Sequence, residues 1–394
     1  MKPLDGIRVV DLSRVLAGPY ASLLLADMGA EVIKVEEPGK GDDTRAWPPF
    51  VGGEATYFMS VNRGKKSLTL DLKAPEGKTL LRRLLEGADV LLENFRPGTL
   101  GRLGFAYETV QEWNPRLVYC SISGFGESGP EASRPGYDLI VQGESGIMDL
   151  TGFPDGPPVK VGNSIADLAA GTMAAHGIVL ALFARERTGV GQKVEIAMVE
   201  VMAALLTYQG QAYFATGRSP RRRGNQHPSI VPYEVFEAAD GYLTVGVANN
   251  SLWARFCQAL DRPDLAADPR FDTEAKRVEQ RDVLVPLLAR VFSKRPVAEW
   301  LARLERTGVP AGKIKEVGEV LESPHLRARG TIVTLPHPTA GPTRMVGPAI
   351  RLHATPGEAS APAPRLGEHT TEVLSKLLGY SEEAIAGFRQ RGVV

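Results

Sequence analysis

Residues 7–35, IRVVDLSRVLAGPYASLLLADMGAEVIKV, decide how the N-terminal part of the chain folds. The apolar run 7–12 predicts a short buried strand, and residues 31–35 predict another. Between them, Pro19 suits the first turn of a helix that ends at Gly29. A strand, a helix and a strand in so short a stretch are typical of a βαβ unit, whose two strands lie parallel in one sheet. The turn at 13–18 lacks the G-x-G-x-x-G pattern, so we expect no dinucleotide site there.

The same alternation continues through the first third of the chain. Strands are predicted at 67–72, 89–93 and 117–123, with a helix from Pro75 to near Gly87. The sequence therefore predicts an α/β fold with a doubly wound parallel sheet, whose ligand lies beyond the carboxyl ends of the strands. Basic residues in the loops of this region suit a phosphorylated ligand. They are Arg14, Arg45, Arg63, Lys65, Lys66, Arg96 and Arg102.

The composition changes at residues 218–228, RSPRRRGNQHP, which we interpret as a linker between two domains. Residues 1–217 form the first part of a large domain. Residues 229–327 form a smaller α+β domain, with a hairpin at Asp240-Gly241 and several amphipathic helices. Residues 328–394 have little core of their own, so we expect them to return to the large domain. Further helices are predicted at 137–148, 197–214, 370–378 and 381–389.

The formal charge is balanced, because Lys and Arg number 46 and Asp and Glu also number 46. A zero net charge argues against nucleic-acid and anionic-membrane partners, which attract a basic excess. The two cysteines are far apart and in no metal-ligand spacing, so we expect a cytoplasmic protein without a metal site. The apolar run 168–182 comes closest to a membrane span, but it is too short and is interrupted by His176 and Gly177.

One segment brings a carboxylate to the start of a predicted helix. Residues 151–158 form a loop rich in Gly and Pro, and the apolar run 168–187 predicts a buried helix that ends at Gly189. Asp167 is the last polar residue before that run. It can be a helix N-cap, stabilised by free N–H groups and by the positive end of the helix dipole. It can also be an ionised nucleophile approached by a flexible loop.

Nearly the whole chain resembles the family III CoA-transferases, the group of formyl-CoA transferase and carnitine CoA-transferase. Each matching motif is weak alone, but together they are highly specific. The motifs are PLDGIRVVDLSRVLAGP (3–19), GAEVIKVEEPGKGD (29–42), KSLTLDLKAPEGK (66–78), ENFRPG (93–98), GYDLIVQ (136–142), TGFPDGPPVKVGNSIADLAAG (151–171), GQKVEIAM (191–198) and LGEHT (366–370).

The resemblance implies that Asp167 is a catalytic aspartate rather than an N-cap. In such enzymes the carboxylate attacks an acyl-CoA thioester to form an acyl-aspartyl anhydride, which the released CoA thiolate converts to an aspartyl-CoA thioester. The acceptor acid then reacts through a second anhydride. An Asp with the ordinary pKa of about 3.9 is ionised at neutral pH, so we expect no activating base, metal or permanently bound cofactor. The resemblance also implies an interlocked homodimer, in which each chain threads through the other.

The resemblance assigns a set of residues to the binding of coenzyme A. They are Leu16, Ala17, Leu70, Asp71, Leu72, Lys73, Asn94, Phe95, Arg96, Arg102, Pro135, Gly136, Tyr137 and Asp138. Two positions depart from formyl-CoA transferase, which has a glutamine in place of Leu16 and an arginine in place of Glu37. Its run of glycines over the active site is also absent, and residues 224–227 stand in the nearest place. We therefore do not expect oxalate and formyl-CoA as substrates.

Residues 224–250 and the tail LGEHTTEVL look most similar to the succinyl-CoA:glutarate CoA-transferase branch, which implies a short dicarboxylate acceptor and succinyl-CoA as donor. Candidate acceptor contacts are Arg223, Gly224, Asn225, Gln226 and His227; the alternative is that they are linker residues facing solvent. An α-methylacyl-CoA racemase is the nearest alternative in function, but such enzymes use a His in a G-H-D segment where this chain has Tyr137. A non-catalytic acyl-CoA-binding protein is the other alternative.

Overall fold

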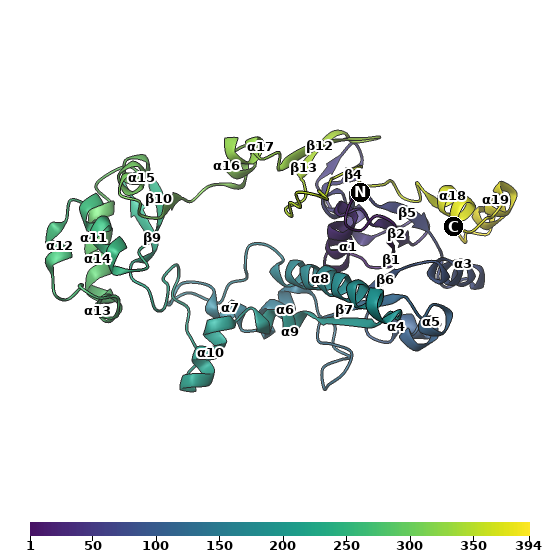
Figure 1. Cartoon of the computed structure of the whole chain (residues 1–394), viewed down its shortest axis with the longest axis horizontal. Helices are drawn as coiled ribbons and strands as arrows, with labels where there is room; N and C mark the ends of the chain where they lie inside the picture. Colours follow the sequence, from purple (N-terminus) through teal and green to yellow (C-terminus); the bar gives the residue numbers. More distant parts are fainter. The chain divides into compact units, whose positions relative to one another are not determined.

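A computed structural model describes all 394 residues, which fold as two compact units (Figure 1). Unit 1 comprises residues 1–147, 160–216 and 324–394. Unit 2 comprises residues 148–159 and 217–323. The C-terminal tail thus folds with the N-terminal half of the chain, whereas residues 148–159, which immediately precede the segment of Asp167, fold with unit 2.

Unit 1 is built on a sheet of six parallel strands in the order β5-β2-β1-β6-β7-β8. The strands are β1 (Arg8–Asp11), β2 (Glu31–Glu36), β5 (Lys66–Thr69), β6 (Val90–Glu93), β7 (Val118–Ser123) and β8 (Lys193–Ala197). Val9 of the central strand pairs with Val32 on one side and Val90 on the other. The parallel sheet predicted from the βαβ alternation is confirmed.

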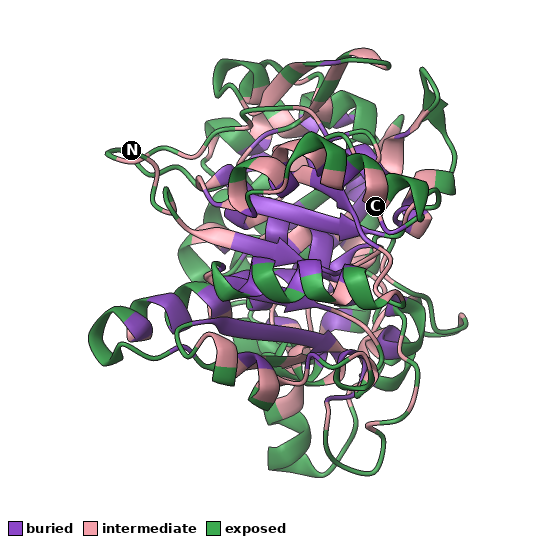
Figure 2. Cartoon of the chain, turned by 90° about the vertical axis from the view of Figure 1, so that its right-hand side faces the viewer, coloured by how far each residue is buried: buried purple, intermediate pink, exposed green.

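Successive side chains of each strand enter two different cores, because a strand points its residues alternately to its two faces. Val9 and Val32 contact one core, whereas Val10 and Ile33 contact the other. Helices α1 (Ala17–Asp27), α6 (Asp138–Glu144), α8 (Ile165–Thr188) and α9 (Met198–Ala204) cover the first face. Helices α3 (Pro75–Glu86), α4 (Thr99–Arg102) and α5 (Tyr107–Trp113) cover the second. Figure 2 shows the resulting arrangement, with buried strands between helices whose outer sides are exposed.

Helices α1 and α8 pack against each other through small residues. Ala166, Ala170 and Ala174 of α8 are fully buried. A Cβ atom on Gly171 would lie only 2.5 Å from the carbonyl oxygen of Ala17, so only glycine permits this approach. The close packing brings the first turns of α8, including Asp167, beside the start of α1.

The C-terminal tail closes the edge of the sheet at β5. The N–H of His369 donates to the carbonyl of Ser67 at 2.9 Å, and the N–H of Thr69 donates to the hydroxyl of Thr370 at 3.2 Å. These bonds cover backbone groups that an edge strand otherwise leaves open to pairing with other chains. The tail contains α18 (Thr370–Glu372), η2 (Val373–Leu377) and α19 (Glu382–Gln390), of which η2 and α19 contribute to the second core. Unit 1 also contains η1 (Asp43–Ala46), α2 (Thr56–Asn62), α17 (Pro324–Ala328) and the hairpins β3 (Phe50–Val51) with β4 (Glu54–Ala55) and β12 (Ile332–His337) with β13 (Gly341–Val346).

Unit 2 has an antiparallel sheet in the order β11-β10-β9 with helices packed on it. The strands are β9 (Tyr233–Ala238), β10 (Gly241–Gly246) and β11 (Ala311–Lys313); the helices are α11 (Asn250–Ala259), α12 (Pro263–Ala267), α13 (Glu274–Glu279), α14 (Arg281–Phe292), α15 (Val297–Arg306) and α16 (Val317–Leu321). Aromatic side chains dominate its core, where Phe292 stacks on Phe236 and meets Trp300 edge-on. The predicted hairpin at 240–241 is present.

Two predicted helices are each broken in the structure. The helix predicted at 137–148 is α6 followed by α7 (Ile147–Leu150), because Gly146 adopts a left-handed conformation with φ +83°. The helix predicted at 197–214 is α9 followed by α10 (Thr207–Thr216), and Thr207, with which α10 begins, has φ +40°. Neither residue continues an α-helix in that conformation.

Helix α8 is longer than the apolar run suggested, since it extends over 24 residues from Ile165 to Thr188. By length and composition alone it could cross a membrane, which the interruption at His176 and Gly177 had argued against. A core helix passes the same test, and 44% of its most apolar stretch is buried within the protein. The finding is therefore weak evidence for a membrane span.

Candidate active site

Asp167 lies in the first turn of α8 but does not cap it. The residue before the helix is Ser164, whose side chain makes no capping hydrogen bond. A carboxylate from another helix takes that role: Oδ1 of Asp138 accepts the N–H groups of Ala166 at 2.9 Å and of Asp167 at 3.4 Å. The N-cap interpretation of Asp167 is therefore wrong, because the cap comes from α6.

The carboxylate of Asp138 is held from both sides. Its second oxygen accepts a hydrogen bond from Nε2 of Gln142 at 2.7 Å, and the residue is 9% exposed. Asp138 lines neither of the cavities described below. Its carboxylate thus lies between α6 and the N-terminus of α8.

Burial raises the pKa of Asp167 to about 7, and the nearby charge of Asp138 acts in the same direction. No group of unit 1 donates a hydrogen bond to the carboxylate of Asp167, so nothing offsets these two effects. The prediction of an ordinary, fully ionised Asp at position 167 is wrong. At neutral pH the residue is close to the midpoint between its protonated and ionised forms.

Asp167 lines a cavity of about 330 Å³ at the carboxyl edge of the sheet. The strand that follows β1 in the chain, β2, lies on one side of β1, whereas β6 lies on the other side. The order of the strands therefore reverses between β1 and β6, and the cavity lies at this point, between the loops that follow these two strands. A crevice at such a switch point is the usual ligand site of an open parallel sheet. Its walls come from residues 14–17, 94–97, 122–124 and 134–137, with Asp43, Thr99 and Met198.

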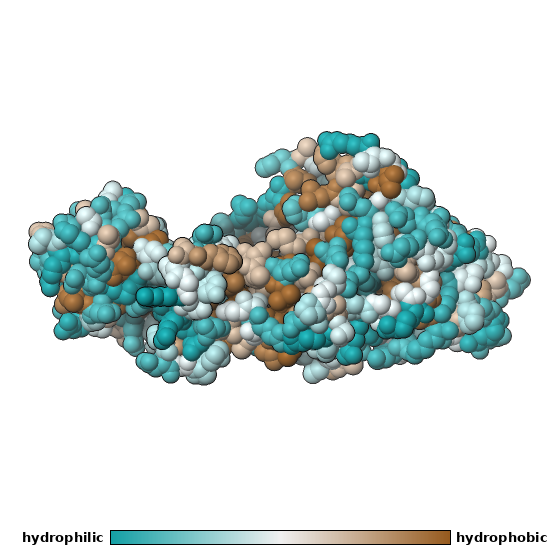
Figure 3. Space-filling model, turned by 90° about the horizontal axis from the view of Figure 1, so that it is seen from below, coloured by the Kyte–Doolittle hydropathy of each residue, from teal (hydrophilic) through white to brown (hydrophobic).

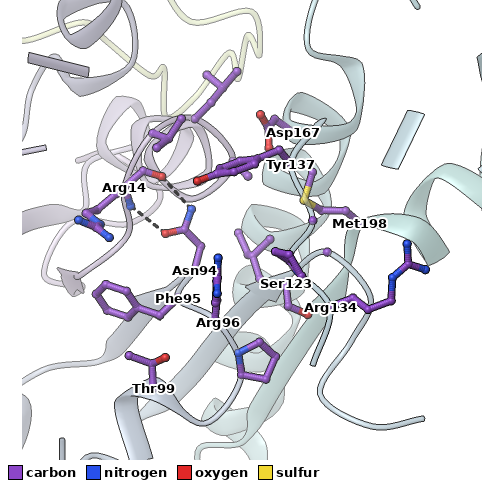
Figure 4. A pocket seen from close by; sticks show the side chains of 18 of the residues that line it. Arg14, Asn94, Phe95, Arg96, Thr99, Ser123, Arg134, Tyr137, Asp167 and Met198 are labelled. Carbon is purple, nitrogen blue, oxygen red and sulfur yellow. Dashed lines mark hydrogen bonds between the residues drawn. The ribbon is translucent and has the colours of Figure 1, made fainter. Parts of the chain in front are cut away.

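The side chains in this cavity are arranged around Asp167 and Tyr137. Figure 4 shows both near one end, with Arg96 and Thr99 farther along. Tyr137 is 71% exposed and follows a close backbone crossing with the loop after β7: a Cβ atom on Gly136 would lie 2.7 Å from Cα of Gly124. Asn94 fixes the loop after β1, since its side chain donates to the carbonyl of Arg14 and accepts from the N–H of Arg14, both at 2.8 Å (Figure 4).

A second cavity of about 400 Å³ adjoins the first, because Arg14, Phe95 and Thr99 line both. Its walls include residues 70–73 after β5, residues 34–37 of β2 and the following loop, and Arg102 of α4. Glu37 lies at its rim, with a carboxylate oxygen 3.8 Å from Nζ of Lys73. The two cavities together can hold an elongated ligand with a charged end and a reactive end.

The structure brings together thirteen of the fourteen residues that the resemblance assigned to coenzyme A, all except Asp138. The first cavity contains Leu16, Ala17, Asn94, Phe95, Arg96, Pro135, Gly136 and Tyr137. The second contains Leu70, Asp71, Leu72, Lys73, Phe95 and Arg102. The first cavity also has lining residues that the sequence motifs did not indicate, among them Ser123, Arg134 and Met198. Ser123 ends a predicted strand and could have been found from that position, whereas Arg134 and Met198 carry no such signal.

The set of seven basic residues is only partly correct. Arg14, Arg96 and Arg102 line the cavities. The other four do not, and each pairs with a carboxylate of unit 1 instead: Arg45 with Glu36, Arg63 with Asp27 and Lys65 with Asp11 in the interior, and Lys66 with Glu31 at the surface. A sequence does not show which cations a buried carboxylate will take.

Residues 223–227 lie in unit 2, and a buried arginine fixes their backbone. Nη2 of Arg281 donates to the carbonyls of His227 at 2.6 Å and Pro228 at 3.1 Å. Nδ1 of His227 accepts the N–H of Ser229 at 3.1 Å, and its ring packs edge-on against Tyr233. Burial and the charge of Arg281 lower the pKa of His227, so the ring is neutral at physiological pH.

The sequence of this chain matches a family model and curated proteins that are CoA-transferases, and its fold matches solved structures. The model of CoA-transferase family III matches residues 4–370. The succinyl-CoA:glutarate CoA-transferase of Mus musculus is 42% identical over 395 residues, covering 100% of this chain and 91% of the relative. The acetyl-CoA:oxalate CoA-transferase of Acetobacter aceti is 42% identical over 373 residues, covering 93% of each chain. A crystal structure of a CAIB/BAIF family protein from Brucella suis has a TM-score of 0.86 and 41% identity, covering 95% of this chain and 99% of that one.

Proposed function

The chain belongs to the family III CoA-transferases and is a CoA-transferase, and from this premise we propose that the carboxylate of Asp167 carries CoA, as a covalent thioester, from an acyl-CoA donor to a carboxylic acid acceptor. The observation that carries this proposal is the position of Asp167: an unpaired carboxylate in a cavity at the switch point of the sheet, beside residues 16–17 and Tyr137. The carboxylate is a nucleophile that needs no base once it is ionised.

The proposed reaction conserves every atom without a cofactor or a metal. A carboxylate oxygen of Asp167 attacks the thioester carbon, the C–S bond breaks, and the thiolate of CoA leaves an acyl-aspartyl anhydride. The thiolate then attacks the aspartyl carbon and releases the donor acid, which leaves an aspartyl-CoA thioester. The acceptor carboxylate repeats both steps in reverse order, so acyl-CoA leaves and the carboxylate of Asp167 returns. Because the anhydride is sensitive to water, the cavity must exclude it during turnover.

We place the nucleotide end of coenzyme A in the second cavity and its thioester end in the first. Lys73 and Arg102 supply positive charge near the phosphates, and Leu70 and Leu72 supply apolar surface. Arg14, which lines both cavities, lies at the junction. Glu37 weakens the local positive charge, because it pairs with Lys73.

We propose succinyl-CoA as the donor and a short dicarboxylate such as glutarate as the acceptor. Support comes from the mouse relative, whose name gives both substrates. The relative from Acetobacter aceti is equally similar but is named for oxalate, so identity alone does not select the acceptor. Arg223 and a neutral His227, both in unit 2, stay candidate contacts of an acceptor carboxylate.

We further propose that the chain acts as an interlocked homodimer in the cytoplasm. Side chains that a monomer would leave exposed support the dimer: Met173, Val179, Leu180 and Phe183 of α8, and Tyr208, Tyr213 and Phe214 of α10. Figure 3 shows apolar residues at the surface among hydrophilic ones. Large exposed apolar groups of this kind usually mark an interface. Two buried, unpaired cysteines fit a reducing compartment.

The test is a substrate screen with a matched pair of variants. Succinyl-CoA is offered to glutarate, malate, itaconate, mesaconate, carnitine and oxalate, and the new CoA thioester is measured by chromatography. Asp167→Asn should lose transfer by several orders of magnitude, whereas Asp43→Asn, which changes a different carboxylate of the same cavity, should retain it within about tenfold. During turnover, hydroxylamine should attack the activated carbonyl of Asp167 in the wild type, release CoA or the donor acid, and leave an aspartyl hydroxamate at this residue that mass spectrometry can detect. Transfer by Asp167→Asn at the wild-type rate would refute the proposal.

A further inference from the structure

Val15 has an unusual backbone conformation at the wall of the active-site cavity. Its φ is +70°, in the left-handed region that β-branched residues rarely adopt. Such a conformation is disfavoured by a factor on the order of ten to a hundred and persists only where its surroundings impose it. Val15 lies directly before Leu16 and Ala17, and all three line the cavity of Asp167. Something in the structure must therefore hold this residue.

Asp42 is the group that holds it. The N–H of Val15 donates to both carboxylate oxygens of Asp42, each at 3.3 Å. The carboxylate is itself fixed, since it accepts the N–H of Thr44 at 2.9 Å and its hydroxyl at 2.8 Å. Nζ of Lys34 lies 2.9 Å from the same carboxylate and donates to the carbonyl of Ser13 at 2.8 Å.

This ion pair is enclosed in the protein. The side chain of Lys34 is 0% exposed and that of Asp42 is 1% exposed. Burial opposes both charges, but Lys34 lowers the pKa of Asp42 and Asp42 raises the pKa of Lys34, so both groups are charged at neutral pH. Such a pair is costly to bury, and removing one partner alone leaves an uncompensated charge in the interior.

We propose that Lys34 and Asp42 are positioning residues, whose ion pair holds Val15 in its left-handed conformation and thereby sets Leu16 and Ala17 against the CoA thioester. The inference rests on the proposed placement of coenzyme A. Lys34 and Asp42 both belong to the motif 29–42. The motif alone does not reveal their positioning role, because the ion pair acts on the backbone of a different loop, the one that follows β1.

The alternative is direct contact with the ligand, since Lys34 and Asp42 also form part of the wall of the second cavity. The substitution Val15→Gly separates the two explanations. Glycine adopts positive φ as readily as negative φ, so its conformation does not depend on Asp42. If Asp42 is a positioning residue, its removal should weaken CoA binding when residue 15 is valine but not when it is glycine. If Asp42 contacts the ligand directly, its removal should weaken binding equally in both cases.

The experiment is a double-mutant cycle read by the affinity for CoA itself. The dissociation constant of CoA is measured by titration calorimetry for the wild type, Asp42→Ala, Val15→Gly and the double variant. In the chain that retains Val15, Asp42→Ala should weaken binding on the order of tenfold or more, because the competent conformation becomes a minor one. In the Val15→Gly background the same change should weaken binding by less than about threefold.

A matched control comes from a second buried ion pair of unit 1. Asp27 pairs with Arg63, and neither residue lines a cavity. Asp27→Ala should therefore change the affinity equally little in both backgrounds. If Asp42→Ala does not fold, Lys34→Met/Asp42→Ala replaces it, since this variant leaves no unpaired buried charge.

Equal weakening in both backgrounds, or no weakening in either, would overturn the positioning role. Failure of the wild type to bind CoA would instead overturn the proposed placement of coenzyme A. The two failures are distinguishable, because the first is a comparison among proteins that all bind CoA.

Discussion

Replacing Asp138 by asparagine should shift the pH dependence of catalysis toward acid. Asp138 contributes a negative charge that raises the pKa of Asp167, and only the ionised form of Asp167 can attack a thioester. The substitution removes the charge but retains a carbonyl oxygen that can accept the N–H of Ala166. It therefore changes the electrostatics of Asp167 while retaining the cap of α8.

The size of the shift follows from the order of the two causes. The pKa of Asp167 is raised from 3.8 to about 7, and burial is the larger cause while Asp138 is the smaller. Removing the smaller cause should therefore lower the pKa by less than about 1.5, which corresponds to less than about 2 kcal/mol. The amide of asparagine would also face the NH₂ group of Gln142, and this mismatch should cost roughly 1–3 kcal/mol of stability.

The assay is kcat/KM for the acyl-CoA between pH 5 and pH 9, which reports ionisations of the free enzyme. The wild type should rise with pH to a plateau with its midpoint near pH 7. Glu93 and Lys65 also have pKa values of about 7, so the midpoint alone does not identify Asp167. A shift of the midpoint in Asp138→Asn does identify Asp167, because Asp138 raises the pKa of that residue.

Asp43→Asn is the control, because Asp43 lines the same cavity but does not contribute to the raised pKa of Asp167. Its midpoint should equal that of the wild type. A midpoint in Asp138→Asn that stays in place or moves to higher pH would refute the electrostatic reasoning. Thermal unfolding of each variant, measured alongside, separates loss of folded protein from loss of activity.

Asp167→Asn should stabilise the protein at pH 8 but not at pH 4. The raised pKa of Asp167 contributes stability that is present below about pH 4 and is lost as pH rises through about 7, and asparagine avoids that loss. The gain in unfolding free energy should be on the order of 1–3 kcal/mol, which denaturant titration at both pH values can measure. Gly171→Ala should lower both the melting temperature and the affinity for CoA, because the new methyl group would lie 2.5 Å from the carbonyl of Ala17; unchanged values in calorimetry would contradict this packing. Glu37→Gln should tighten CoA binding by less than about fivefold at low salt and have no effect at high salt, because Glu37 and Lys73 are both largely exposed. Titration at the two ionic strengths checks this, and weaker binding at low salt would argue against it.

Much of the fold could be predicted because local patterns specify it. The βαβ unit at 7–35 and the later strands follow from short apolar runs between turns, and the structure pairs them in one parallel sheet. Buried parallel strands are apolar on both faces, so their signal is strong. Helix breaks at Gly146 and Thr207 were missed, because an apolar pattern does not show where the backbone turns to positive φ.

The residues of the candidate site were likewise predicted only in part. Sequence motifs identified Asp167 and nearly all residues of the two cavities, because those residues follow the carboxyl ends of predicted strands or lie at the start of α1 and α8. They assigned Asp138 to coenzyme A, whereas its carboxylate caps α8. Four ion-paired cations were also assigned to the ligand. In each of these cases the sequence does not show which partner the side chain takes in the fold.

The sequence by itself determined the parallel sheet, the family and the aspartate on which the proposed chemistry depends, since these follow from local apolar patterns and contiguous motifs. Only the tertiary structure decided the charge state of that aspartate, because its pKa depends on burial and on a carboxylate 29 residues away in the chain. Only the tertiary structure, likewise, showed that the N–H of Val15 donates to the carboxylate of Asp42. Electrostatic energies depend on distance in space and on exclusion of water, and neither quantity is written in the order of the residues.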